Sequence, residues 1–234
     1  MCFNQKYSAS FALLGLFSLY FFNKNKKYYE NNLLYIPLIF YTLMEVLQTA
    51  QYNYVNQCDN IMNKLLTEIS YILVVVQPFM WNMIFLYRQR KIKLTDFHKG
   101  ILYCGIILSL IWIIAHILRR FSFYGNDEYV NEVTQGKKTC TYKKDNEHLY
   151  WKYKYNSVYG MDANWFMYLV LWFIPGLLIP GEFLTILTLV LGFALSYMYI
   201  IYNSHTRDIT PSLWCLTSGP TLFLNIIIYY FYGK

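Results

Sequence analysis

The sequence carries very little charge for its length. Only 14% of its 234 residues are charged, whereas a typical soluble domain has about 25%. Hydrophobic residues make up 56% of the chain and occur in long blocks. So little charge cannot solvate a globular surface, which excludes a soluble enzyme, and so many apolar residues exclude a disordered chain. The composition predicts a multi-pass membrane protein.

Cysteine and histidine are also scarce, and neither is clustered. The chain has 5 cysteines and 4 histidines, with no Cys-x-x-Cys and no histidine four residues from another. This excludes a disulfide-rich secreted domain, and it excludes a membrane zinc hydrolase, which needs clustered imidazoles and carboxylates. We therefore predict no metal and no cofactor. Nucleic acid is excluded as a partner, because the net charge of +7 comes without a folded basic domain.

Apolar stretches recur along the whole chain. Seven of them approach the roughly 20 residues that a helix needs to cross a bilayer. The fold class that we predict is an all-α membrane protein, a seven-transmembrane-helix bundle forming one domain over 1–234, with one polar loop, 119–163, as a small cap. The predicted spans are 7–22, 33–54, 65–87, 100–118, 164–179, 183–202 and 213–230.

The positive charges next to these spans indicate an orientation. Nine lysines and arginines lie in short loops on the side of the C-terminus, and five lie near span ends on the other side. The positive-inside rule then predicts a cytoplasmic C-terminus and an external or lumenal N-terminus. Counting the other lysines of the loop 119–163 changes the comparison to nine against eleven, which leaves the opposite orientation open. We expect the lipid bilayer as partner, with anionic headgroups at the basic cytoplasmic loops.

The second predicted span has a polar stripe. Tyr41, Glu45, Gln48 and Thr49 recur at steps of three and four residues and so share one helical face. Glu45 lies near the predicted midplane, where an ionisable side chain costs roughly 2.5–3.5 kcal/mol and should face the protein interior. This predicts a channel- or transporter-like pathway for a small ion or solute, with Glu45 as a gating or proton-binding carboxylate. Polar residues of other spans would complete it: Gln77, His116, Thr221 and Asn225.

The same polar residues have a structural interpretation. Side chains of this kind also join helices inside a membrane through hydrogen bonds worth about 0.6 kcal/mol each. A carboxylate is not needed for that purpose, because asparagine or glutamine would join helices without an ionisable group. Glu45 therefore favours function, whereas serine, threonine and asparagine alone favour the structural interpretation.

Three cysteines suggest further chemistry. Cys58 and Cys140 fall on the same predicted side, where an oxidising compartment would allow a disulfide between them and a reducing one would leave two free thiols. Removal of Met1 would leave Cys2 at the N-terminus, where its own amine can act as the base for its thiol. A membrane-embedded enzyme using Cys2 is therefore an alternative to transport. A receptor or a structural membrane component without catalysis is the other alternative.

Short motifs at both ends of the chain resemble a known family. The chain opens with Met-Cys-Phe-Asn and begins its last predicted span with Ser-Leu-Trp-Cys. These resemble the Met-Cys-Phe-Ser opening and the Ser-Val-Trp-Cys motif of an uncharacterised membrane family of about seven spans, found in bacteria, protists and large DNA viruses. The resemblance draws attention to Cys2, Glu45, Trp214 and Cys215. It implies no reaction, because that family has no established activity.

Overall fold

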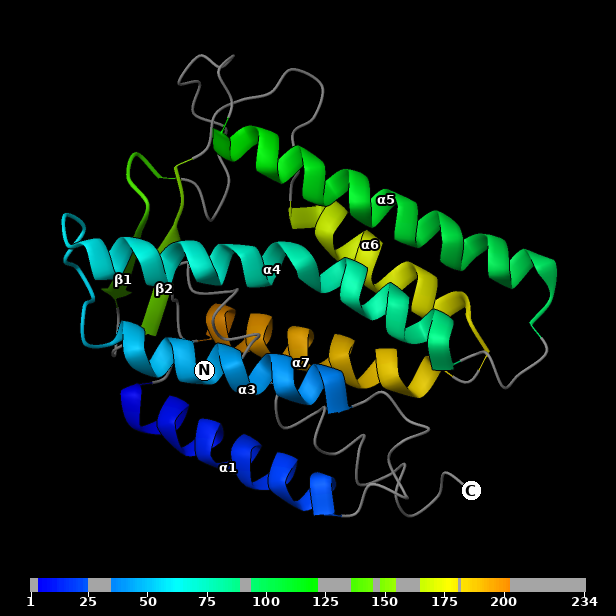
Figure 1. The fold of residues 1–234 in the computed structure, drawn as a ribbon, viewed down its shortest axis with the longest axis horizontal. Helices are drawn as coiled ribbons and strands as arrows, with labels where there is room; N and C mark the ends of the chain where they lie inside the picture. The colour runs from blue at the N-terminus through cyan, green and yellow to red at the C-terminus, as the bar shows by residue number, and fades with distance from the viewer. Residues whose placement is uncertain are drawn as a thin grey trace. The chain divides into compact units, whose positions relative to one another are not determined.

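The structure is a computed structural model, which describes residues 4–24, 35–88, 94–121, 136–144, 148–154, 165–180 and 182–202. Within these residues the chain forms six helices and two strands (Figure 1). Its internal contacts divide it into two compact units. The elements are α1 (Gln5–Lys24), α3 (Tyr35–Gln51), α4 (Ile61–Arg88), α5 (Asp96–Phe121), β1 (Cys140–Lys144), β2 (His148–Lys152), α6 (Trp165–Leu178) and α7 (Phe183–Tyr202).

The first unit comprises Met1–Thr67, Cys140–Trp151 and Leu184–Lys234, and its helices α1 and α3 lie side by side (Figure 1). The buried face of α1 is a row of small residues at steps of three and four: Ser8, Ala12, Gly15 and Ser18. A methyl group on Gly15 would lie 2.2 Å from Oγ1 of Thr42. The two backbones therefore approach as closely as helices do at small-residue interfaces.

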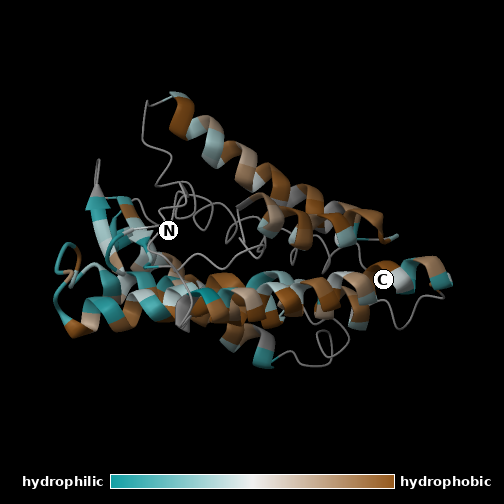
Figure 2. Cartoon of the chain, turned by 90° about the horizontal axis from the view of Figure 1, so that it is seen from above, coloured by the Kyte–Doolittle hydropathy of each residue, from teal (hydrophilic) through white to brown (hydrophobic). Residues whose placement is uncertain are grey.

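A β-hairpin is held against the turn between α3 and α4, in the same unit. Strands β1 and β2 pair in a two-stranded antiparallel sheet. A disulfide joins Cys58 in the turn to Cys140 at the start of β1, with their Cα atoms 5.1 Å apart. The amide of Asn63 also donates to the carbonyl oxygen of Thr141 at 3.0 Å and accepts from its N–H at 3.0 Å. Hydrophilic residues gather around this hairpin and turn (Figure 2).

The second unit comprises Glu68–Thr139 and Lys152–Phe183, which include most of α4 together with α5 and α6. Helices α5 and α6 pack side by side (Figure 1). The core of this unit is aromatic, because Trp81 is fully buried and its ring lies 5.6 Å from that of Phe85 and 6.1 Å from that of Trp172. Aromatic side chains bury more apolar surface per residue than other side chains, so these rings contribute much of the stability of this core.

The predicted seven-transmembrane-helix bundle is wrong. Among the described residues only two helical segments are long and apolar enough to cross a membrane, Ile61–Tyr87 and Asp96–Arg119. Helix α3 has 17 residues and a polar face, while α6 and α7 supply only the shorter apolar segments Phe166–Leu178 and Val190–Tyr202. The fold is also not all-α, because the loop 119–163 contains β1 and β2.

The reason for this error is physical. Apolar residues are required wherever water is excluded, and a protein core excludes water as a bilayer does. Composition alone cannot separate the two, and helix length adds only a lower bound, because a helix must have about 20 residues to cross a bilayer. The predicted span 213–230 lies outside the described residues.

Candidate functional site

Glu45 is buried at the centre of the first unit. It lies on the inner face of α3 with only 3% of its surface exposed. The hydroxyl of Ser8, on α1, donates a hydrogen bond to its carboxylate. Desolvation by burial raises the pKa of the Glu45 carboxyl above its ordinary value of 4.5, and the Ser8 hydrogen bond acts in the opposite direction because it favours the charged form. The arrangement favours a carboxyl group that can take up a proton in place.

The other residues of the predicted stripe differ in their surroundings. Tyr41 and Gln48 are buried on the same face of α3 as Glu45. Thr49 is different, because its hydroxyl donates to the backbone carbonyl of Glu45 at 2.8 Å and is satisfied within its own helix. Glu45, Tyr41 and Gln48 are thus the members of the stripe that point inward, and Thr49 is part of the helix structure.

The glutamine that ends this stripe is not among the predicted site residues. Gln51 is 1% exposed and joins three elements, since its amide donates to the carbonyl of Leu66 on α4 at 3.1 Å and its oxygen accepts from Nε1 of Trp151 on β2 at 3.1 Å. Its position in the stripe, at i+3 from Gln48, was a signal that could have found it. Gln51 thereby fixes the C-terminal end of α3 to α4 and to the hairpin.

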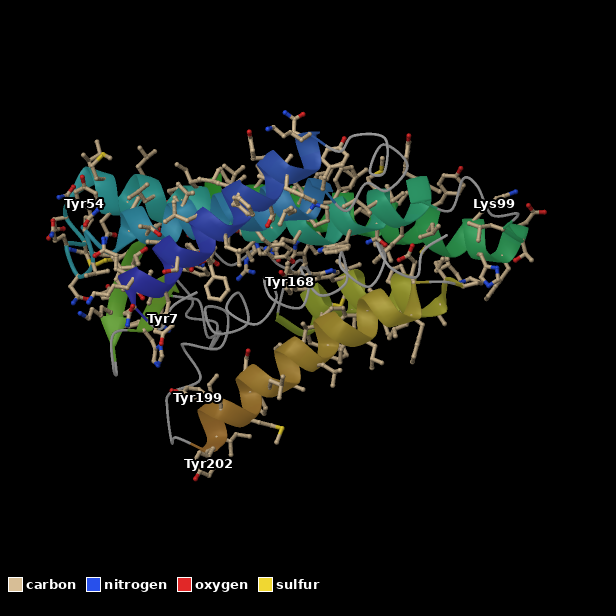
Figure 3. All side chains as sticks on the ribbon, turned by 90° about the horizontal axis from the view of Figure 1, so that it is seen from below. Tyr7, Tyr54, Lys99, Tyr168, Tyr199 and Tyr202 are labelled. Atoms are coloured by element: carbon tan, nitrogen blue, oxygen red, sulfur yellow. A yellow bond between two sulfur atoms is a disulfide. The ribbon has the colours of Figure 1, made fainter. Side chains whose placement is uncertain are left out.

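His116 and Gln77 lie in the second unit, each with an aromatic partner. Nδ1 of His116 lies 2.6 Å from the hydroxyl of Tyr71, and its ring packs 4.2 Å from that of Trp112. The hydroxyl of Tyr168, labelled in Figure 3, donates a short hydrogen bond to the Gln77 side chain. The predicted pathway residues are therefore divided between the two units, with Glu45, Gln48, Tyr41 and Thr49 in the first and these two in the second.

Asn82, which is not among the predicted site residues, is the main polar junction of the second unit. Its amide lies within hydrogen-bond distance of the carbonyl oxygens of Pro78 at 2.8 Å and Leu171 at 2.9 Å, and of the Ser109 hydroxyl at 3.2 Å. It thereby ties α4 to α5 and α6. An asparagine within a long apolar helix was a signal of such a role, because a buried amide must find partners.

The chain matches a family of unknown function, DUF5765, over residues 6–230. The chain belongs to this family. This match confirms the prediction that the chain belongs to an uncharacterised family. No curated protein and no solved structure matches the chain. Membership of DUF5765 brings no activity with it, so function has to be inferred from the geometry of this chain.

Five other predicted residues of this DUF5765 chain belong to its two ends. Cys2, Trp214, Cys215, Thr221 and Asn225 all lie outside the described residues. Within the described part of the chain, no three histidine, cysteine, aspartate or glutamate side chains gather as a metal ion would require. Glu45 and its neighbours on α3 and α1 are thus the group on which a functional proposal can be built.

Proposed function

We propose that this DUF5765 protein is an integral membrane protein that crosses the bilayer through α4 and α5. Only 33% of the apolar segment of α5 is buried inside the protein. Its outer face exposes Ile107, Ile111 and Ile114, each to more than half of its surface. A soluble protein rarely leaves such a continuous apolar surface in water, whereas a lipid-facing helix requires one.

We propose that the α4–α5 pair is oriented with the disulfide outside or in a lumen. The Cys58–Cys140 bond is at the beginning of α4, and disulfides persist in oxidising compartments. Five lysines and arginines and a single acidic residue fall between 88 and 99, at the other end of the helix, and such charges favour the cytoplasm. Both features support the same orientation, in which the residues before α4 and the hairpin after α5 lie outside or in a lumen. Because two crossings return the chain to its starting side, the cytoplasmic C-terminus predicted from the sequence would require a third crossing after α5.

An epitope tag inserted at 89–93 and another at 145–147 test this orientation. The first should be reached by antibody only from the cytoplasm, and the second only from the opposite side of the membrane. If both tags are reached from the same side, the proposed α4–α5 hairpin is wrong.

We propose further that Glu45 is the proton-binding group of a channel- or transporter-like protein for a small ion or solute. The burial of its carboxyl group beside the Ser8 hydroxyl carries this proposal. A carboxyl group in a dry site binds and releases a proton at little structural cost only if hydrogen-bond partners are present in both states. Ser8 can supply one, since a hydroxyl both donates to a carboxylate and accepts from a carboxylic acid.

Proton flux into sealed vesicles tests the role of Glu45. The purified full chain is reconstituted with a trapped pH-sensitive dye, and a pH gradient is imposed at zero membrane potential. We expect the gradient to decay faster than in protein-free vesicles, and Glu45→Gln to return the decay to the protein-free rate. Glu182→Gln is the matched control, because Glu182 is also buried, at 1% exposure, but lies just before α7 and not on the inner face of α3.

The two variants separate function from folding. Glutamine keeps the size and hydrogen-bonding capacity of glutamate but cannot ionise, so Glu45→Gln should be recovered in the same amount as the unchanged protein. A Glu45→Gln protein with an unchanged rate of decay would overturn the proposal. The same conclusion would follow if Glu182→Gln abolished the flux to the same extent.

A further inference from the structure

Helix α6 contains a proline close to its C-terminal end. Pro175 has no backbone N–H, so it cannot donate the hydrogen bond that the carbonyl oxygen of Leu171, four residues earlier, receives in an unbroken helix. A buried carbonyl oxygen without a donor costs free energy, and Leu171 is buried. The Leu171 carbonyl therefore needs a donor from outside its own helix.

Asn82 on α4 supplies this donor. The two acceptors nearest to its amide nitrogen, Nδ2, are the carbonyl oxygen of Leu171 at 2.9 Å and that of Pro78, in its own helix, at 2.8 Å. The Nδ2 group carries two hydrogens, one for each of these oxygens. Asn82 is fully buried, so water does not compete for the same positions. A side chain of α4 thus takes the place of the backbone donor that α6 lacks.

A glycine on α5 lets the three helices meet at this point. A Cβ atom on Gly105 would lie 2.8 Å from Oδ1 of Asn82 and 2.9 Å from Cγ of Pro175. Both distances are shorter than a normal contact, so a larger residue at 105 does not fit while Pro175 is in this position. Gly105, Leu171 and Pro175 also line an apolar groove of about 440 Å³ between α5 and α6. The end of α6 is therefore part of the wall of this groove.

The amide of Asn82 is only partly satisfied in this arrangement. Among the described residues, no donor lies within hydrogen-bond distance of its Oδ1 atom, which is also buried. A buried acceptor without a donor costs free energy, and this cost offsets part of what the two Nδ2 bonds contribute. The end of α6 is therefore held by a small net free energy, which is the condition for an element that has two positions.

We propose that Asn82 is a latch that holds the last turn of α6 against α5, and that this turn has a second, released position. In the released position the bond from Nδ2 of Asn82 to the Leu171 carbonyl is broken, Pro175 moves away from Gly105, and the groove is wider at that end. The latch thereby controls the width of the groove. The proposal uses only contacts within the second unit, so it does not depend on the membrane location or on the role of Glu45.

Hydrogen exchange at the end of α6 tests the latch. Deuterium uptake by the full chain in detergent micelles is followed by mass spectrometry at the amides of 176–178, which belong to the turn after Pro175. Asn82→Ala should raise their exchange rate about tenfold, the factor that corresponds to a hydrogen bond worth about 1.4 kcal/mol. Pro175→Ala should not raise it, because the new N–H at 175 donates to the Leu171 carbonyl within the helix.

The double variant separates a latch from a general loss of packing. With alanine at 175 the Leu171 carbonyl no longer needs Asn82, so Asn82→Ala combined with Pro175→Ala should exchange no faster than the unchanged protein. Gln77→Ala is the matched control, because Gln77 is also buried on α4 but bonds Tyr168, which is about 12 Å before residue 176 along α6. It should leave the exchange of 176–178 unchanged.

Three results would overturn the latch. They are unchanged exchange in Asn82→Ala, no recovery in the double variant, and an equal increase in Gln77→Ala. If Asn82→Ala alone does not fold, the double variant should fold, because its Leu171 carbonyl has a donor. Failure of both to fold would therefore also contradict the proposal.

Distances between two spin labels test the released position itself. The labels are attached at Tyr103→Cys on α5 and Leu178→Cys on α6, two exposed positions outside the groove lining, after Cys2, Cys104 and Cys215 are replaced by serine. Asn82→Ala in this background should add a population with a longer distance, and the further change Pro175→Ala should remove it. The same single distance with and without Asn82→Ala would show that α6 has one position and that the groove has one width.

Discussion

Removing the Cys58–Cys140 bond should destabilise the first unit by an amount that the structure sets. The two cysteines are 82 residues apart in the sequence. In the chain-entropy model, a closed loop of that length removes about 15 cal/mol/K from the unfolded chain, which corresponds to about 4.5 kcal/mol at 25 °C. Since losses of native disulfides typically fall at about 2–5 kcal/mol, we expect Cys58→Ser to lower the free energy of unfolding by about 2–4.5 kcal/mol.

Unfolding by guanidinium in detergent, followed by tryptophan fluorescence, measures this loss. Trp151 reports on the hairpin, because its ring is buried in β2 and its Nε1 donates to Gln51. Cys58→Ser, Cys140→Ser and the double variant should lose the same stability, since all three remove one bond. Reduction of the unchanged protein should reproduce that loss.

Cys104→Ser is the control for this measurement. Cys104 is a free, exposed cysteine on α5, and its replacement should change the free energy of unfolding by no more than about 0.5 kcal/mol. If the Cys58 and Cys140 variants change stability no more than this control, the disulfide contributes nothing. Losses that add up in the double variant would contradict a bond shared by the two residues.

Three other substitutions test the first unit. Gly15→Ala should lower the melting temperature through an overpacking cost of about 1–3 kcal/mol, because the new methyl group would overlap Thr42. Trp151→Phe should cost about 1–3 kcal/mol in guanidinium unfolding, because it leaves the buried oxygen of Gln51 without its donor. Because the pKa of Glu45 is raised in the folded protein, the folded state keeps a proton on this carboxyl group that the unfolded state releases. The stability that the Glu45 carboxyl group contributes is therefore complete below pH 4.5 and is lost as the pH rises. Unfolding measured from pH 4 upward should show this loss, and Glu45→Gln should abolish it; an equal pH dependence in the variant would contradict the assignment.

Local patterns in the sequence predicted several elements well. The stretches 65–87 and 100–118 correspond to α4, Ile61–Arg88, and α5, Asp96–Phe121. These helices could be predicted because an apolar run of about 20 residues bounded by charges is too long for a strand and too apolar for a loop. The periodicity of Tyr41, Glu45 and Gln48 likewise places them on one face, since a helix repeats every 3.6 residues whatever surrounds it. All three are buried in α3.

Tertiary structure decided what those faces meet. Gln77 bonds Tyr168 across 91 residues of sequence, and Asn82 bonds the carbonyl of Leu171 across 89. Such partners are chosen by the packing of helices, which no local pattern encodes. The burial of β1 and β2 on the α3–α4 turn depends in the same way on Asn63 and Thr141, 78 residues apart.

The sequence by itself determined the amphipathic faces, the long apolar helices and the inward position of Glu45, because these depend on neighbours within a few residues. Only the tertiary structure decided which apolar faces are covered by protein and which stay open. Of the six predicted spans that fall in the described part of the chain, two correspond to helices long and apolar enough to cross a membrane. The physical reason is that burial is a property of pairs of surfaces. The sequence predicts which face of a helix avoids water, and the packing of the chain determines which surface covers that face.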